Sequence, residues 1–273
     1  MALSVVIITC NEETNLRRTL DSVVPLVCDG GEVIIVDNGS TDRTLDIARE
    51  FGAKVFVEEW KGYAAQKNSA IAKATCDWVL SLDADEAVGP ELANEIAEWV
   101  ALLSPSGECR ATMRDTGEGN KVGMNFAGFS IPRKNYFLGR WIKHAGFYPD
   151  AKLRLFRRSK GRFVERPVHE VMEVDGPTGT LKGALDHHTY PSLSGYIDTM
   201  NRYSSLGAEI AASKGQDRFS FLNIVLRPLA TFISMYLLRL GLLDGREGLL
   251  LCLYHSVYVS WKYAKAWELT REK

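Results

Sequence analysis

The chain has 273 residues, of which 46% are hydrophobic and 25% are charged, which excludes a disordered chain and leaves ample length for a large core. The formal net charge of −1 is unevenly distributed: acidic residues outnumber basic ones in 29–98, and basic residues dominate 133–166. A basic segment beside an acidic one suggests a phosphate-bearing ligand, although a solvated surface accounts for the outer arginines equally well.

The five cysteines are scattered along the chain and form no C-x-x-C pair. This pattern indicates neither a disulfide framework nor a zinc site, and it fits a reducing cytoplasm. The N-terminal residues MALSVVIIT lack the basic start and the cleavage site of a signal peptide, so we expect them to form a first strand.

Strand and helix patterns alternate through the N-terminal part of the chain. We expect strands at 3–9, 32–37, 54–57 and 78–82, and helices at 12–24, 40–52, 63–74 and 90–103. Pro25 is expected to stop the first helix and Gly52 to close the second. Continuous apolar strands separated by helices predict a parallel sheet that is covered on both faces.

The composition changes after residue 103. Residues 104–123 are polar and rich in glycine, which predicts a loop. Strands are expected again at 126–133 and 152–158, and helices beyond Pro191.

Two uncharged apolar runs lie in this helical tail. The run 228–238 has eleven residues and the run 248–261 has fourteen, short of the roughly 18 residues that a membrane span requires. Aromatic and lysine side chains lie close to the apolar positions. The runs therefore predict either helices that lie in a membrane interface or a helical region packed on the core or on another subunit.

Polar side chains follow three of the expected strands, at the point where each strand ends. In an open parallel sheet the ligand lies at this edge. The residues at the three strand ends are Thr9, Asn11 and Glu12, then Asp37, Asn38 and Ser40, and finally Asp83, Asp85 and Glu86. The sequence therefore predicts a binding site at this edge of the sheet.

The pattern Asp83-x-Asp85 follows the apolar segment WVLSL and precedes a helix. Two carboxylates at this spacing would repel each other at the end of a buried strand unless they shared a cation. Mg²⁺ or Mn²⁺ is typically held by one or two carboxylates and by the phosphates of a substrate. The pattern alone is weak, with an acidic turn as the alternative, but its position favours a metal ion and a diphosphate ligand.

Three segments, SVVIITCNEETNLRRTLDSV, VIIVDNGSTDRTLDIAREFGA and GYAAQKNSAIAKATCDWVLSLDADE, resemble the nucleotide-sugar-binding half of family 2 glycosyltransferases, which have the GT-A fold. The later segment RKNYFLGRWIKHAGFYPDAKLRLFRR, with VHE and LDHHTY, is similar to the bacterial lipopolysaccharide-core glucosyltransferases. The resemblance covers about residues 3–203. It implies an α/β fold with a mostly parallel central sheet flanked by helices, followed by a C-terminal helical extension.

The resemblance also implies a division of the chain. The transferase domain would span 1–190, with a nucleotide-sugar half at about 1–103 and an acceptor half at about 124–190. The helical region 191–273 would then associate with a membrane or with another subunit.

By the same resemblance, Asp37 would hold the nucleoside and Asp83 would border the ribose, while Asp85 would bind Mg²⁺ or Mn²⁺ directly. The donor would be a UDP-sugar. The residues expected to bind the nucleotide sugar are Thr9, Asn11, Glu12, Asp37, Gln66, Lys67, Asp83 and Ala84.

An inverting transfer requires a base that takes a proton from the acceptor hydroxyl. We favour Glu170 in VHE as this base, with Asp150 in FYPD as the competitor. His188 in LDHHTY is expected either to reach the metal or a phosphate, or to bond to backbone in a turn. The candidates for phosphate or acceptor contacts are Lys143, Tyr148, Arg154, Arg157 and His169; Trp141 and Phe147 would stack on a sugar or fill an aromatic cluster.

The expected function is transfer of a hexose, glucose by resemblance, from a UDP-sugar to a glycolipid or oligosaccharide acceptor of the cell envelope. We expect a cytoplasmic location, peripheral on the inner face of the membrane, with no nucleic-acid partner and with a homo-oligomer through the C-terminal helices as an open alternative. The rival functions are a polyprenyl-phosphate sugar synthase and a non-catalytic nucleotide-sugar-binding protein of the same fold. A dinucleotide oxidoreductase is disfavoured because no G-x-G-x-x-G follows the first expected strand.

Overall fold

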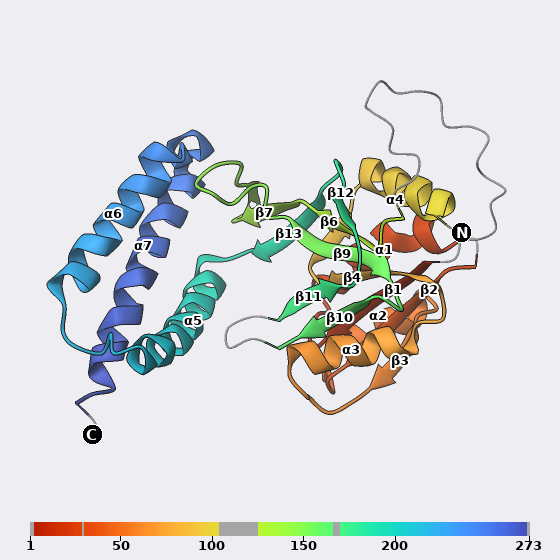
Figure 1. Ribbon diagram of the computed structural model, residues 1–273, viewed down its shortest axis with the longest axis horizontal. Coiled ribbons are helices and arrows are strands. Elements are labelled where there is room, and N and C mark those ends of the chain that lie inside the picture. Colours follow the sequence, from red (N-terminus) through yellow and green to blue (C-terminus); the bar gives the residue numbers. More distant parts are fainter. Residues whose placement is uncertain (1–2, 29, 104–124, 166–169, 272–273) are drawn as a thin grey trace. The chain divides into compact units, whose positions relative to one another are not determined.

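The computed structural model describes residues 3–28, 30–103, 125–165 and 170–271 of the chain (Figure 1). The chain divides into two compact units. The first comprises Met1–Arg133 and Ala151–His187, and the second comprises Lys134–Asp150 and His188–Lys273. Residues 134–150, which the sequence groups with the transferase domain, thus belong to the unit that contains the C-terminal helices.

A seven-stranded sheet forms the centre of the first unit, with the strand order β12-β6-β9-β4-β1-β2-β3 (Figure 1). Its strands are β1 (Leu3–Thr9), β2 (Glu32–Asp37), β3 (Lys54–Val57), β4 (Trp78–Asp83), β6 (Gly128–Ile131), β9 (Lys152–Arg157) and β12 (Thr178–Thr180). Strand β1 runs parallel to β2 and β4, and β2 runs parallel to β3, whereas β9 is antiparallel to β4 and β6. The predicted α/β fold with a mostly parallel sheet is confirmed.

Helices pack on both faces of this sheet because successive side chains of a strand point to opposite faces. The helices are α1 (Leu16–Val27), α2 (Thr44–Glu50), α3 (Tyr63–Lys73) and α4 (Pro90–Leu103). Leu3, Val5 and Ile7 of β1 share a buried cluster with apolar residues of α1, α2 and α4. Val6, between them, shares a second cluster with apolar residues of α3. The polar ends of β1, β2 and β4 are therefore held on a rigid, two-sided core.

The first helix differs from the prediction at both ends. Glu12 lies before the helix, where its backbone carbonyl accepts the N–H groups of Asn15 at 3.0 Å and Leu16 at 2.9 Å. Pro25 lies inside the helix, which ends at Val27. A proline removes one helical hydrogen bond, and this loss is tolerated because the helix ends soon after it.

Two further strand pairings occur in the first unit. The short strand β5 (Glu86–Val88), which the sequence does not predict, pairs antiparallel with β13 (Leu185–Tyr190), so that Glu86 lies opposite His187. Strands β10 (Gly161–Val164) and β11 (Val171–Val174) form a separate antiparallel pair. The pairing of β5 with β13 brings a late segment of the chain next to the acidic turn that follows β4.

The second unit is built mainly from helices. Its elements are β7 (Arg133–Phe137), β8 (Arg140–Trp141), α5 (Leu193–Ser213), η1 (Leu222–Leu226), α6 (Arg227–Ile233), η2 (Ser234–Leu238), η3 (Gly241–Asp244) and α7 (Gly245–Glu268). Helices α5 and α7 pack around a core that includes Tyr196, Met200 and Leu251 (Figure 1). The helices expected beyond Pro191 are thus present.

Within the described ranges, no single helix has both the length and the apolar composition to cross a membrane. The segments Leu222–Leu238 and Gly241–Glu268 meet that test only together, and the chain bends by 73° between them. Helix α7 buries Leu251, Cys252 and Tyr263, so the apolar run 248–261 contributes to the core of the second unit.

Glu32, at the start of β2, ties together three segments of the first unit. Its carboxylate accepts hydrogen bonds from Ser4 and from the Thr75 N–H at 2.6 Å each, and from Lys54 at 2.6 Å. Burial alone would raise the pKa of Glu32, but these hydrogen bonds outweigh it and lower the pKa to about 2. Because the pKa is lower in the folded chain, the contribution of Glu32 to stability is complete above its ordinary pKa and is lost as the pH falls through about 2.

We expect Glu32→Gln to lower the free energy of unfolding by about 2–3 kcal/mol at neutral pH. The difference from the native chain should shrink as the pH falls from about 5 towards 2. Urea unfolding across this pH range measures it. The control is Glu59→Gln, which alters an exposed carboxylate and should change stability by less than about 0.5 kcal/mol. A Glu32→Gln deficit that does not vary with pH would contradict the assignment.

Candidate active site

The loops that follow β1 and β2 are joined by hydrogen bonds. The fully buried Asp37 carboxylate accepts the Thr9 hydroxyl at 2.7 Å, the Ser40 hydroxyl at 2.5 Å and the Ser40 N–H at 2.7 Å. The side-chain carbonyl of Asn11 accepts the N–H of Thr41 at 2.9 Å, and Asn11 has a positive φ of 56°. Thr9, Asn11 and Asp37 therefore lie together at one edge of the sheet, with Asp37 bonded within the protein.

The end of β4 holds Asp83 between two cations. Asp83 Oδ1 lies 2.8 Å from Lys67 Nζ, and Oδ2 is paired with the Arg154 guanidinium. Burial alone would raise the pKa of Asp83, but the charges of Arg154 and Lys67 hold it well below its usual range. The next residue, Ala84, accepts the Thr19 hydroxyl on its backbone carbonyl at 2.6 Å, which fixes the turn against α1. Asp83 is thus an ionised carboxylate that protein cations already neutralise.

Glu86 belongs to the same buried ion network. Its Oε1 lies 2.6 Å from the Arg154 guanidinium and 3.1 Å from that of Arg133, and its Oε2 accepts the Asp83 N–H at 3.0 Å. The sequence groups Glu86 with the strand-end residues that face a ligand. In the structure its side chain is fully buried, as the partner of two arginines. Glu86 therefore supports the acidic turn from the interior.

Lys67 connects this network to Glu170. Its Nζ lies 2.7 Å from Glu170 Oε1 and 2.8 Å from Asp83 Oδ1, and it lies 5.1 Å from the centroid of the Phe163 ring. The lysine is buried, so both ion pairs are shielded from water. One side chain on α3 therefore holds Glu170 next to the end of β4.

Asp85 lies beside His187. Asp85 Oδ2 is 3.4 Å from His187 Nε2, and the two side chains are 23% and 11% exposed. Two ligands at right angles on Mg²⁺ lie about 3.0 Å apart when each is about 2.1 Å from the ion. The carboxylate and the imidazole therefore fit neighbouring positions on one divalent ion. In the described part of the chain no group of three or more such side chains could hold a metal, so the remaining ligands would be substrate and water oxygens.

Glu12 adds to the negative potential of this edge. Burial is the largest cause that raises the pKa of Glu12, and the charges of Asp85, Asp42 and Asp83 raise it further, against a hydrogen bond from Asn15 that lowers it. The loop after β1 and the turn after β4 thus present a field that favours a bound cation.

Gln66 presents a buried amide with unused hydrogen-bonding groups. The residue is 1% exposed, and neither Nε2 nor Oε1 has a partner among the residues that the structure describes. A buried polar group left unpaired costs about 1–3 kcal/mol. A ligand that offers both a donor and an acceptor would relieve this cost.

Comparison with known families identifies the family of the chain. The model described as glycosyl transferase family 2 matches residues 4–162, more than half of the chain. The chain belongs to glycosyl transferase family 2. The matched residues include both loops and the acidic turn described above.

Relatives of this family 2 glycosyltransferase match nearly its whole length. It is 28% identical over 276 residues to the lipopolysaccharide core biosynthesis glycosyltransferase LpsC of Rhizobium meliloti, over 98% of this chain and 93% of that protein. It is 46% identical over 256 residues to an uncharacterised glycosyltransferase of Rickettsia prowazekii, RP128, over 90% of this chain and 80% of that protein.

A solved structure shares its fold. The mannosyltransferase PcManGT from Pyrobaculum calidifontis, in complex with GDP-mannose and Mn²⁺, matches with a TM-score of 0.52 at 17% identity. The match covers 99% of this chain and 88% of that one. The glycosyltransferase described here therefore has the GT-A fold.

Several predicted residues of the glycosyltransferase lie outside the ion network. Arg157 pairs with Asp77, and its guanidinium lies 5.0 Å from the centroid of the Trp78 ring. The Arg157 guanidinium thus contacts residues at the start of β4. The predicted contact His169 lies outside the described residues.

The predicted acceptor contacts Lys143 and Tyr148 belong to the second unit. Lys143 Nζ lies 4.6 Å from the centroid of the Trp141 ring, and Tyr148 packs edge-on against the same ring at 5.4 Å. Asp150, the competing base, lies in the same unit, with Oδ2 3.5 Å from the Asn135 amide. Lys143 and Tyr148 thus pack on Trp141, and Asp150 contacts Asn135.

The two adjacent histidines of β13 have different surroundings. His187 faces Asp85, whereas His188 stacks on Tyr136 at 4.5 Å between ring centroids. The sequence names only His188 as a metal ligand. Because side chains alternate along a strand, the two histidines are expected to point to opposite faces. Which of them faces Asp85 follows only from the pairing of Glu86 with His187.

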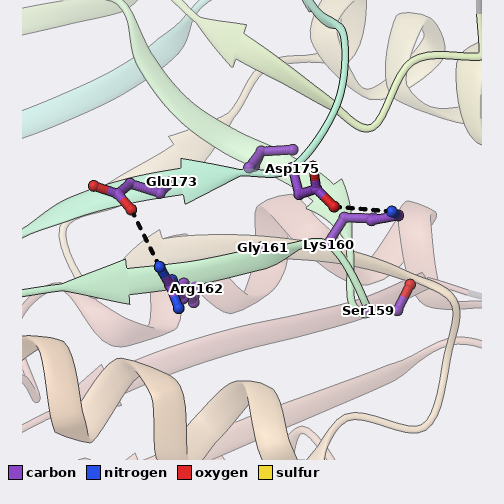
Figure 2. A pocket seen from close by; sticks show the side chains of 7 residues that line it. Ser159, Lys160, Gly161, Arg162, Glu173 and Asp175 are labelled. Atoms are coloured by element: carbon purple, nitrogen blue, oxygen red, sulfur yellow. Dashed lines mark hydrogen bonds and ion pairs between the residues drawn. The ribbon is translucent and has the colours of Figure 1, made fainter.

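A surface hollow on the β10–β11 pair is a weaker candidate. Figure 2 shows its lining, in which Arg162 pairs with Glu173 at 3.7 Å and Lys160 with Asp175 at 3.1 Å. Exposed ion pairs of this kind contribute little to binding or stability. The hollow contains none of the residues that the sequence predicts for the site.

Proposed function

We propose that the protein is an inverting, metal-dependent glycosyltransferase that moves a hexose, glucose in this proposal, from a UDP-sugar to a hydroxyl of a cell-envelope glycolipid such as lipopolysaccharide core. The observation that carries the proposal is the contrast at the end of β4. Asp83 is neutralised by Lys67 and Arg154, whereas Asp85 lies beside a histidine at 3.4 Å in a field of carboxylates. The similarity to LpsC over nearly the whole chain supports the choice of acceptor.

We propose that the donor's nucleoside lies between the loops after β1 and β2 and helix α3. The buried Gln66 amide supports this location because its donor and acceptor lack partners in the described structure. The edge of uracil offers one acceptor and one donor side by side, which matches an amide. Asp37, Thr9 and Asn11 would shape the pocket through the hydrogen bonds that join the two loops.

In this proposal Asp85 and His187 hold the divalent ion. Bound there, the ion would neutralise the charge that develops on the departing diphosphate. Asp83 is occupied by Lys67 and Arg154, so we assign it to orientation of the ribose and of Lys67.

We propose Glu170 as the base, ahead of Asp150. Lys67 contacts Oε1 of Glu170 and orients the carboxylate next to the end of β4, and Oε2 would take the proton of the acceptor hydroxyl. A base must lie within hydrogen-bonding distance of that hydroxyl. Glu170 shares a compact unit with the strand ends, which supports its assignment over Asp150.

The test is a panel of UDP-glucose, UDP-galactose, UDP-N-acetylglucosamine and GDP-mannose, each with and without Mn²⁺. We expect UDP-glucose with Mn²⁺ to raise the free energy of unfolding by about 2.7 kcal/mol at a concentration of about 100 times its dissociation constant. Omission of the metal should abolish most of this stabilisation. Stabilisation by GDP-mannose alone would overturn the donor, and equal stabilisation without metal would overturn the metal assignment.

A further inference from the structure

The second unit exposes an unusual number of large apolar side chains between Phe219 and Leu243. We call this set the leucine-rich face. Its members are Phe219, Phe221, Leu222, Val225, Leu226, Leu229, Ile233, Leu237, Leu238, Leu240, Leu242 and Leu243. Single exposed leucines are ordinary on soluble proteins, but a contiguous set of this size marks an interaction surface.

The face lies on one side of an amphipathic segment. Leu222, Leu226, Leu229, Ile233 and Leu237 follow one another at intervals of three or four residues and are exposed, which is the spacing of one helix face. The segment contains two π-helical stretches, η1 and η2, on either side of α6.

The opposite side of the segment is already used within the unit. Ile224 packs on the cluster that contains Ala208 and Tyr263, and Met235, Phe232 and Cys252 share another buried cluster. The segment is therefore fixed to α5 and α7 by one side. The leucine-rich face is the side left over after this packing.

The turn that ends the segment extends the face. Leu238 is 76% exposed, and Leu240 is about half-exposed in a left-handed conformation with φ of 57°. Leu242 and Leu243 follow in η3 and are also exposed. The left-handed region is unfavourable for a residue with a side chain, so the fold retains a strained leucine at an exposed turn.

The charges along this segment have a single sign. From Arg218 to Leu243 the charged residues are Arg218, Arg227 and Arg239. The flanking acidic residues are Asp217, which directly precedes the segment, and Asp244, which is buried and accepts the His144 N–H at 2.9 Å. The rim of the leucine-rich face therefore carries Arg218 and Arg239 at its two ends, whereas the Arg227 guanidinium donates to the Tyr263 hydroxyl and packs over the Tyr263 ring.

We propose that the leucine-rich face binds the surface of an anionic phospholipid bilayer, with Leu222–Leu243 lying in the plane of the interface. An apolar face bordered by arginines enters the boundary between acyl chains and headgroups, while the cations contact anionic lipid. A two-fold contact with a second copy would set arginine rims against each other, which like-charge repulsion opposes. This inference deepens the membrane location expected from the sequence, and it requires neither the donor nor the proposed chemistry.

The test is co-sedimentation of the full chain with phosphatidylcholine vesicles, with and without phosphatidylglycerol. We expect binding to the anionic vesicles that weakens in high salt, and a partition coefficient at least about tenfold lower for the variant Leu229→Gln/Leu238→Gln. The matched control is Leu206→Gln/Leu269→Gln, which replaces two leucines that are 37% and 38% exposed outside the face and should leave the partition unchanged.

Three results would overturn the proposal. An equal loss of vesicle binding in both double variants would show that binding does not depend specifically on the leucine-rich face. Protein that remains with the vesicles after an alkaline carbonate wash would indicate insertion across the bilayer. A wild-type dimer in sedimentation velocity that Leu229→Gln/Leu238→Gln dissociates, without vesicle binding, would assign the face to a second copy. Stabilisation by UDP-glucose and Mn²⁺, measured on every variant, separates a failure of this surface from a failure of the donor site.

Discussion

Asp85→Asn is expected to lower the rate of sugar transfer by about 10³-fold or more while the fold stays intact. The substitution keeps the size of the side chain and removes its charge. Asp85 is the carboxylate of the turn that faces His187, whereas Asp83 is neutralised by the protein. Without the charge at position 85, the proposed ion would lose its anionic protein ligand, and the diphosphate would depart without compensation.

Initial rates with a UDP-sugar and Mn²⁺ measure this effect, and urea unfolding checks the fold. Asp46→Asn is the matched control, because Asp46 is exposed and pairs with Arg49 on the surface of α2. Glu170→Gln provides the contrast: it should retain stabilisation by donor and metal but lose about 10²–10⁴-fold in turnover. An Asp85→Asn enzyme with normal turnover and normal metal-dependent donor binding would remove the basis of the proposed mechanism.

Which of the two histidines lies beside Asp85 could not be predicted from the sequence. Adjacent residues of a strand such as β13 point to opposite faces, so a shift of one residue in register would exchange His187 and His188. The pairing of β13 with β5 places His187 opposite Glu86, and β5 is a short strand of three residues that the sequence does not predict. The sequence names His188 for the metal or a phosphate, with a histidine bonded to backbone in a turn as the alternative, whereas in the structure His187 is the histidine beside Asp85.

Contacts between charged residues that are far apart in the sequence could not be predicted from local patterns either. Continuous apolar runs suffice to predict β1, β2 and β4, and the polar residues at their ends follow directly from this prediction. Lys67 and Glu170, in contrast, are separated by 103 residues and meet only because α3 packs near β10 and β11. Glu86 looks like a ligand-facing carboxylate in the sequence and is an internal ion partner in the fold. Pairings of this kind depend on tertiary structure, which local patterns do not encode.

The internal ion network should also set the stability of the first unit. We expect Arg154→Met to lower the free energy of unfolding by about 3–5 kcal/mol. Arg154 is buried and lies between Asp83 and Glu86. Without it, Glu86 keeps Arg133 as its partner and Asp83 keeps Lys67. The negative charge that Arg154 had balanced then lies in the interior, where an unbalanced charge is unfavourable. The methionine side chain fills a similar volume, so the loss should come from the charge rather than from a cavity.

Urea unfolding at neutral pH measures this loss, with Arg17→Met as the matched control. Arg17 pairs with Glu50 on the surface, where both side chains are about half-exposed, so its replacement should cost less than about 1 kcal/mol. The double variant Arg154→Met/Glu86→Gln also removes the negative charge of Glu86. It should recover part of the stability lost in Arg154→Met, because residues 154 and 86 are energetically coupled. If Arg154→Met costs no more than Arg17→Met, or if the two changes at positions 154 and 86 are additive, the buried network does not hold the acidic turn. In that case the orientation of Asp83 and Asp85 would have to come from the packing of β4 and β5 alone.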